Sequence, residues 1–285
     1  MSWKNLIGGL LLAAVVLSGA YDRLLETVRN TPSGTSLPET AGGRMGAAPP
    51  VRDGALSDPG LPVTVVERSS LIIRHLGYTV SYNADTRIAN WVAWTLTPDR
   101  FEEVVSRYDK FLPDPEVGED AVTTEDYTRS GYDRGHLCPA ADNKWDKQAM
   151  RESFYMTNVC PQNHNLNRGD WKELEEACRE WTLEHGKLYV VAGPVLYRGE
   201  HRRIGMRRVV VPEAFYKVVF CPEPLKAIGF IYKNTSGNHP LDAYINTVDE
   251  VERITGLDFF PDLPDSLEIQ VESVCNIKEW RMPER

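Results

Sequence analysis

The sequence lacks several features that would assign it to a class directly. Its N-terminal apolar run, Leu6–Leu17, is shorter than the roughly 20 residues that a transmembrane helix needs. The five cysteines include no Cys-x-x-Cys pair, so a zinc site of the usual spacing is not expected. Basic residues are not in excess, because 32 Lys and Arg stand against 41 Asp and Glu, and the formal charge of −9 argues against tight non-specific binding of polyanions. No internal repeat is visible, and a hydrophobic fraction of 42% is typical of an ordinary globular protein.

The N-terminus has the pattern of a targeting segment. Lys4 precedes the apolar run, and Ser18-Gly19-Ala20 fits the small-x-small pattern of signal-peptidase cleavage. We therefore predict a signal peptide over residues 1–20 and a periplasmic or secreted protein with no stable membrane insertion after cleavage. The alternative is a protein anchored in the membrane through this segment. Residues 21–62, rich in Pro, Gly, Ser and Thr from Asn30 onward, are predicted to be a disordered linker.

Cysteines in an exported protein suggest disulfides. Their number is odd, so at least one is free or pairs between chains. Cys221 and Cys275 form the first candidate pair. Cys138, Cys160 and Cys178 are expected to be buried thiols or to form one local bridge, with a metal centre as the less favoured alternative.

From Val63 to the C-terminus the pattern predicts one globular domain, residues 63–285. Tyr78–Tyr82 and Ile88–Leu96 alternate as two strands around a turn. Trp171, Leu174, Cys178 and Trp181 recur on one face of a helix. The other predicted elements are strands at Leu188–Ala192 (ended by Gly193-Pro194), Val209–Val211, Tyr216–Phe220 and Ala227–Tyr232, a short helical start in Pro98–Tyr108, and a helix over Leu241–Ile254 ended by Gly256. Strands mixed with isolated helices predict an α+β fold rather than a doubly wound parallel sheet.

The most informative stretch is Gly131–His136, followed by Asn167 and, eight residues later, Glu175. A histidine can take a proton from water near neutral pH. An arginine, here Arg134, can hold a phosphate with two hydrogen bonds. An Asn carbonyl suits a hard divalent cation, and a carboxylate can hold the waters of that ion. Together these groups indicate phosphodiester chemistry.

The chain resembles the DNA/RNA non-specific endonuclease family, the ββα-metal (His-Me finger) nucleases that include endonuclease G. The resemblance covers roughly residues 70 to 265. The residues that carry it are Ser130–His136, Pro139–Asn143, Phe154–Gln162, Leu166–Trp171, Leu174-Glu175, Ser81–Asn83, Asn90–Trp94, Tyr189–Val195 and Pro212–Lys217. It implies a central mixed or antiparallel sheet with flanking helices.

The resemblance also implies a mechanism, which is metal-assisted hydrolysis to 5′-phosphate products. His136 would act as the general base, and Arg134 would stabilise the pentacovalent phosphate. Asn167 would be the direct ligand of Mg²⁺ or Mn²⁺, and Glu175 would hold the waters of the ion. Asp133 is expected to anchor the turn.

Several further residues are expected around this centre. Arg168, Arg202 and Arg203 are candidates for substrate binding, because a local basic face could meet a polyanion on an acidic protein. Asn158 is expected to support the site. His164 is expected to contact substrate or to lie solvated in a loop, with metal ligation as the alternative.

The substrates implied are DNA and RNA without base or sugar preference, because every group in the motif addresses phosphate. A homodimer is one option for the assembly. Two alternatives remain open. One is a catalytically inactive nucleic-acid-binding relative, and the other is a metal-dependent phosphodiesterase on smaller substrates.

Overall fold

The computed structural model describes residues 59–281. The predicted signal peptide, with the alternative membrane anchor in the same segment, and most of the predicted linker lie outside these residues. Within the described part, no helix is both long and apolar enough to span a membrane.

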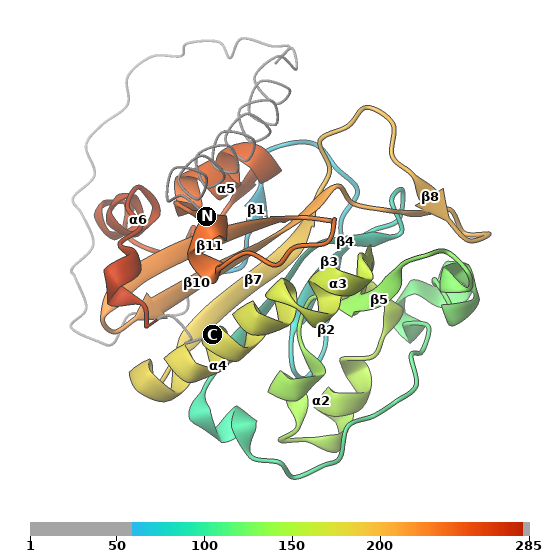
Figure 1. The fold of residues 1–285 in the computed structure, drawn as a ribbon, viewed down its shortest axis with the longest axis horizontal. Coiled ribbons are helices and arrows are strands. Elements are labelled where there is room, and N and C mark those ends of the chain that lie inside the picture. Colours follow the sequence, from blue (N-terminus) through green and yellow to red (C-terminus); the bar gives the residue numbers. More distant parts are fainter. Residues whose placement is uncertain (1–58, 282–285) are drawn as a thin grey trace, which may run out of the picture. The chain divides into compact units, whose positions relative to one another are not determined.

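Seven strands of the described chain form one antiparallel sheet, in the order β12-β11-β10-β7-β4-β3-β2 (Figure 1). The strands are β2 (Leu71–Arg74), β3 (Thr79–Asn83), β4 (Ile88–Leu96), β7 (Leu188–Val195), β10 (Ala214–Pro222), β11 (Leu225–Lys233) and β12 (Ile245–Asn246). Three short strand pairs lie outside it: β1 (Val63–Thr64) with β13 (Leu257–Asp258), β5 (Asp133–His136) with β6 (Val159–Gln162), and β8 (Arg203–Ile204) with β9 (Val209–Val210).

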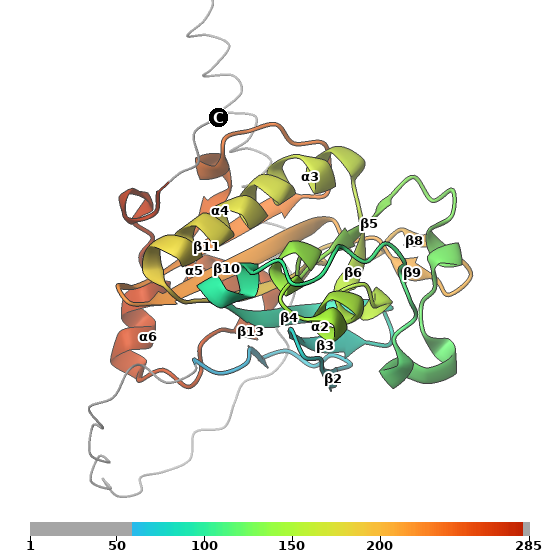
Figure 2. The ribbon, with the colours of Figure 1, turned by 90° about the horizontal axis from the view of Figure 1, so that it is seen from below.

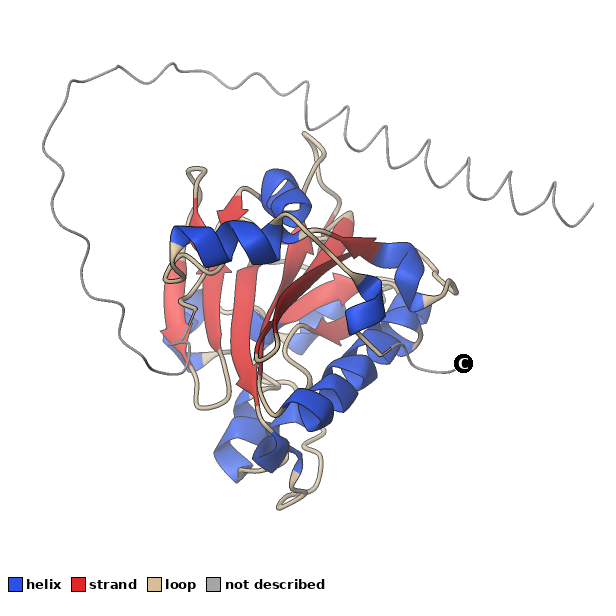
Figure 3. Ribbon diagram, turned by 90° about the vertical axis from the view of Figure 1, so that its left-hand side faces the viewer, coloured by secondary structure: helices blue, strands red, loops and turns tan. Residues whose placement is uncertain are grey.

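The α-helices of the described chain are α2 (Lys147–Glu152), α3 (His164–Arg168), α4 (Asp170–His185), α5 (Val248–Thr255) and α6 (Asp265–Glu272). Short 3₁₀ helices span Pro98–Phe101, Pro115–Asp120, Thr124–Tyr127, Ala140–Asn143, Met156–Asn158, Leu241–Tyr244 and Ile277–Glu279. Figure 3 shows helices on both sides of the sheet. The arrangement confirms the predicted α+β fold.

The helix α4 covers one face of the sheet. The aromatic ring of Trp171 lies 5.6 Å from that of Phe215 in β10, and Trp181 stacks on Phe230 in β11 at 6.2 Å. Figure 2 shows α4 running along these strands. Its predicted apolar face is confirmed, and Gly186 ends the helix with a φ of 81°.

The helices α5 and α6 cover the opposite face. Tyr216 alternates with Phe215 along β10 and contacts Phe259, with ring centroids 5.7 Å apart. Val251 of α5 lies so close to Gly229 of β11 that a Cβ there would come within 2.7 Å of it. Because both faces of β10 and β11 are covered, these strands are apolar along almost their whole length.

Two predicted elements need correction. Leu241–Ile254 is not one helix: a 3₁₀ turn and β12 precede α5, because Ile245 and Asn246 pair with β11. The strand β7 does not end at Gly193-Pro194 but continues to Val195. β4 pairs with β7 only as far as Ala192 in the described sheet, so Pro194 lies where one side of the strand is open and a missing N–H is tolerated.

The predicted Cys221–Cys275 disulfide is wrong, whereas the expectation that Cys138, Cys160 and Cys178 are buried thiols is confirmed. All five cysteines lie in the described part of the chain, and none is paired there. Cys138, Cys160, Cys178 and Cys221 are buried. Burial raises the pKa of Cys178 to about 12, so this side chain is a neutral thiol in the core.

Candidate active site

The motif residues lie on a strand–strand–helix unit. β5 pairs antiparallel with β6, and His136 at its end lies opposite Val159. Gly135 allows the two strands to approach closely, because a Cβ there would lie 2.6 Å from the Cβ of Gln162. The glycine of the motif is therefore required by packing.

Two consecutive helices follow β6. The side chain of Asn163 caps α3 by accepting hydrogen bonds from the backbone N–H groups of Asn165 and Leu166. Gly169 joins α3 to α4, and a Cβ there would meet the carbonyl oxygen of Asn165 at 2.7 Å. Trp171 Nε1 then donates to the carbonyl oxygen of His136 at 3.2 Å, which fixes the start of α4 against the end of β5.

His136 is half-buried, and its ring packs between two phenylalanines. The ring centroids of Phe111 and Phe154 lie 5.0 and 4.9 Å away. Its Nε2 is buried with no hydrogen-bond partner among residues 59–281, which leaves Nδ1 as the nitrogen available to the surrounding cleft. Burial, with the charges of Arg107 and Arg134, lowers the pKa of His136 to about 3. The imidazole is therefore neutral at pH 7 and can accept a proton.

Asn167 and His164 meet the carboxylate of Asp133. Asn167 Nδ2 donates to Asp133 Oδ2 at 2.9 Å, and His164 Nδ1 lies 3.1 Å from both carboxylate oxygens. Burial opposes ionisation of Asp133, but these two hydrogen bonds and the charge of Arg168 lower its pKa overall. Asp133 thus does more than anchor a turn, because it orients the Asn167 amide.

Glu175 lines the same cleft from α4. Burial raises its pKa to about 7, partly offset by the positive charge of Lys217. Lys217 is fully buried, with its Nζ 4.4 Å from the ring centroid of Trp171. One helical turn beyond Glu175, Arg179 Nη1 donates to the buried Asp142 Oδ1 at 3.1 Å. A network of buried charges therefore holds this part of α4.

These side chains line one cleft of about 850 Å³. The predicted site residues in its lining are Asp133, Arg134, His136, Asn167, Arg168 and Glu175. Its basic lining residues are Arg107, Arg129, Arg134, Arg168, Lys172 and Arg179, against the acidic Asp133 and Glu175. The cleft is thus basic on a protein of net negative charge, as an anionic substrate requires.

Three predicted residues lie outside the lining. Asn158 is buried behind the site, where its amide hydrogen-bonds both the N–H and the carbonyl of Cys138 at 2.8 Å and so holds the segment after His136. Arg202 donates to Tyr132 Oη at 3.3 Å, at the edge of the cleft. Arg203 instead donates to the carbonyls of Asp85 and Arg208, which fits a structural role rather than the predicted substrate contact.

Among the lining residues that the sequence did not predict, three place or support positive charge in the cleft. Arg179 could have been found, because it follows Glu175 by four residues on one helix face. Arg107 and Phe111 lie in a loop with no periodic pattern. Phe111 supports Arg134, whose guanidinium carbon lies 4.8 Å from its ring centroid.

The cleft offers oxygen ligands suited to a hard divalent cation. With Nδ2 of Asn167 engaged by Asp133, its Oδ1 accepts no hydrogen bond from the described residues. The carboxylate of Glu175 lines the same space. A neutral carbonyl and a carboxylate are the donor set that Mg²⁺ or Mn²⁺ prefers.

Comparison with known proteins identifies the family. The sequence model of the DNA/RNA non-specific endonuclease family matches residues 58–266, most of the chain. The chain belongs to this family. As a member it is a nuclease, a hydrolase acting on nucleic acids, and the resemblance drawn from its motifs is confirmed.

Named relatives support the assignment. The chain is 30% identical to mitochondrial nuclease EXOG of Xenopus laevis over 99% of its own length and 80% of the relative's. It is 36% identical to a nuclease of a Nostoc strain, over 69% of the chain and 75% of that protein. It is 32% identical to mitochondrial endonuclease G of Bos taurus, over 80% and 78%.

The fold agrees with a solved nuclease of this kind. A crystal structure of an EndoG/EndoGI complex superposes with a TM-score of 0.66 at 27% identity, covering 74% of this chain and 90% of that one. The ββα-metal nuclease fold is thereby confirmed for this family member.

Proposed function

We propose that the protein is a metal-dependent endonuclease that hydrolyses DNA and RNA without sugar preference and leaves 5′-phosphate ends. The observation that carries the proposal is the convergence of His136, Asn167 and Arg134 on one basic cleft. An inactive nucleic-acid-binding relative would have no chemical need for all three groups together.

His136 is the general base in this proposal. Its free imidazole takes a proton from the attacking water as the water approaches phosphorus. Burial is the main reason that the pKa of His136 is as low as about 3, and the charges of Arg107 and Arg134 lower it further. A bound phosphate would offset only this second contribution.

Asn167 Oδ1 and the Glu175 carboxylate are the groups that would hold Mg²⁺ or Mn²⁺, the first directly and the second through its waters. The cation, when bound, supplies charge stabilisation to the phosphate and the leaving oxygen. Asp133 keeps the Asn167 amide turned so that its oxygen remains available.

In this proposal Arg134 and Arg168 bind phosphate groups of the substrate. Arg202 contacts the nucleic-acid strand at the edge of the cleft. An arginine fork reads phosphate geometry and carries no base information. Specificity for neither sequence nor sugar is therefore expected from the lining.

The test compares substrates and metals directly. Purified protein is incubated with plasmid DNA, with RNA and with bis-p-nitrophenyl phosphate, each with Mg²⁺ or EDTA, beside His136→Ala to exclude a contaminating nuclease. Internal cleavage of both polymers only with Mg²⁺, and end-labelling that requires prior phosphatase, is the expected result. Turnover of the small ester alone would favour a small-substrate phosphodiesterase, and no turnover of any substrate would favour an inactive binding relative.

Export is a separate proposal that the N-terminal pattern of Leu6–Leu17 and Ser18-Gly19-Ala20 supports. Several relatives carry mitochondrial names, and an N-terminal segment removed on organelle import is the competing interpretation. N-terminal mass spectrometry should find a mature end near Tyr21. Recovery of full-length chain from membranes would favour an anchor instead. Whether the protein forms a homodimer stays a prediction.

A further inference from the structure

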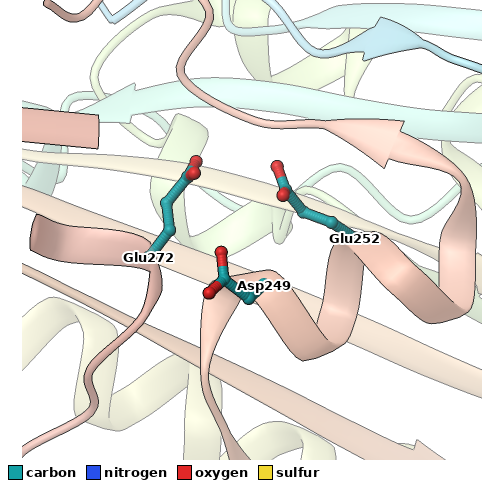
Figure 4. A group of neighbouring side chains, drawn as sticks. All are labelled: Asp249, Glu252 and Glu272. Atoms are coloured by element: carbon teal, nitrogen blue, oxygen red, sulfur yellow. The ribbon is translucent and has the colours of Figure 1, made fainter. Parts of the chain in front are cut away.

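Three carboxylates converge far from the active-site cleft, on the helices of the opposite sheet face. Asp249 and Glu252 lie three residues apart on one side of α5, and Glu272 is the last residue of α6. One carboxylate oxygen of each lies within 4.8 Å of the others. Figure 4 shows the three groups facing a common space.

Glu272 is the unusual member of this acidic trio. Its side chain is buried, with 6% of the residue exposed, and Oε1 has no hydrogen-bond partner among residues 59–281. A buried carboxylate is normally paired or hydrogen-bonded, because leaving it unpartnered is costly. The group points into the space that it shares with Asp249 and Glu252.

The surroundings increase this cost. Glu272 ends α6, where the partial negative charge of the helix C-terminus disfavours an anion, and the last turn of this helix carries no basic residue. The nearest basic residue on α5, Arg253, pairs with Glu250 at 2.7 Å. None of the three carboxylates makes an ion pair within the described chain.

The electrostatics agree with the geometry. Burial, and then repulsion from Glu252, Glu268 and other acids, raises the pKa of Glu272 to about 9. Burial raises that of Glu252 to about 7 against the one hydrogen bond that its Oε1 accepts, from Phe259 N at 2.7 Å. Within residues 59–281, no ion pair therefore offsets the charge of these carboxylates.

We propose that Asp249, Glu252 and Glu272 bind a divalent cation, best suited to Ca²⁺, that fastens α5 to α6. The ligand oxygens of the three residues lie within 4.8 Å of one another, close enough for one cation held at about 2.3–2.6 Å from each, as Ca²⁺ is in proteins. Three carboxylates from two helices also match the flexible all-oxygen coordination of Ca²⁺.

The role of this ion would be structural. Both helices pack against β11, so fastening them together stabilises the cover of that sheet face. A ligand that binds only the folded chain raises its stability by mass action. The rival interpretation is that Glu272 carries a proton and no ion binds.

The test uses the full chain with Asn167→Ala, so that the active-site ligand does not contribute. Calorimetric titration with CaCl₂ should give one site per chain. Saturating CaCl₂ should raise the melting temperature, by about 5 °C or more. Glu272→Gln and the exposed Asp249→Asn, each added to this background, should weaken binding by about tenfold or more and remove the shift. Glu250→Gln removes the same charge from α5 outside the trio and should leave both measurements unchanged.

The variants also distinguish binding of a cation from protonation of Glu272. In EDTA, Glu272→Gln should melt at or above the parent temperature, because the amide avoids the cost of burying or protonating the acid, and this shows that the variant folds. Absence of any Ca²⁺ response in the parent, or an equal response in parent and Glu272→Gln, would overturn the proposal. Neither outcome depends on nuclease activity, which the Asn167→Ala background already lacks if the proposed function holds.

Discussion

The carboxylate of Asp133 holds the amide of Asn167 by a 2.9 Å hydrogen bond from Nδ2 to Oδ2. A hydrogen bond of this kind fixes which way an amide faces, since its nitrogen and oxygen have opposite roles. The metal-binding end of Asn167 is thus set by a residue of the strand that also carries His136.

Asp133→Ala should therefore raise the Mg²⁺ concentration needed for half-maximal cleavage by about 10- to 100-fold. The Asn167 amide loses its fixed orientation, while the general base is untouched. Metal titration of plasmid cleavage measures the effect. His164→Ala is the matched control, since it removes another partner of the same carboxylate and should change the titration much less. Equal effects of the two substitutions would argue against the orienting role.

His136→Ala should reduce the rate of plasmid cleavage by about 10²- to 10⁴-fold at saturating Mg²⁺. The loss follows from removal of the general base, and Mg²⁺ binding should remain, because the ligand Asn167 is intact. Initial rates and a calorimetric Mg²⁺ titration measure the two properties. Near wild-type turnover in this variant would exclude His136 as the base.

Stability at acid pH should also depend on His136. Its folded-state pKa of about 3 lies below the usual value of 6.5, so between these pH values the unfolded chain binds the extra proton. His136 then lowers stability increasingly as the pH falls from 6.5 toward 3, and this cost vanishes above 6.5. His136→Gln should lose less melting temperature than wild type between pH 7 and pH 4, relative to a His164→Gln control. If the melting temperatures of all three proteins fall in parallel between pH 7 and pH 4, the pKa of His136 is not lowered.

Gly135→Ala should destabilise the domain by about 1–3 kcal/mol and reduce activity. The new methyl group would collide with Gln162 and push β5 away from β6, and His136 with it. Denaturant unfolding and initial rates measure the change. Gly199→Ala is the control, because a Cβ at Gly199 meets nothing within 4 Å. A Gly135→Ala variant as stable as this control would mean that Gln162 and β6 can shift to accommodate the methyl group at little cost in stability.

The structure places in one cleft those predicted site residues that are close together in the sequence. His136, Asn167 and Glu175 lie on β5, α3 and α4, within one short stretch of the chain, so the motif that contains them is visible in the sequence. The apolar face of α4 followed from its periodicity for the same reason.

Long-range contacts account for what the sequence did not predict. Arg107 reaches the cleft because backbone hydrogen bonds from Val104 and Val105 to Lys144 dock its loop, and no local pattern records that contact. Ile245 and Asn246 leave the predicted helix because β11 offers them a strand partner. Glu272 lies near α5 only because of tertiary packing. Its burial therefore could not be predicted from the residues next to it in the sequence.

Covering the sheet on both faces gives the molecule two electrically different sides. The side of α4 carries a cleft with six basic lining residues, and the side of α5 and α6 carries the acidic trio. The basic cleft attracts a long polyanion over the ~8 Å range that physiological salt leaves unscreened, whereas the acidic trio, with or without its cation or proton, does not. The net charge of −9 therefore acts on orientation: it disfavours unproductive encounters and leaves the cleft as the side on which a nucleic acid can settle.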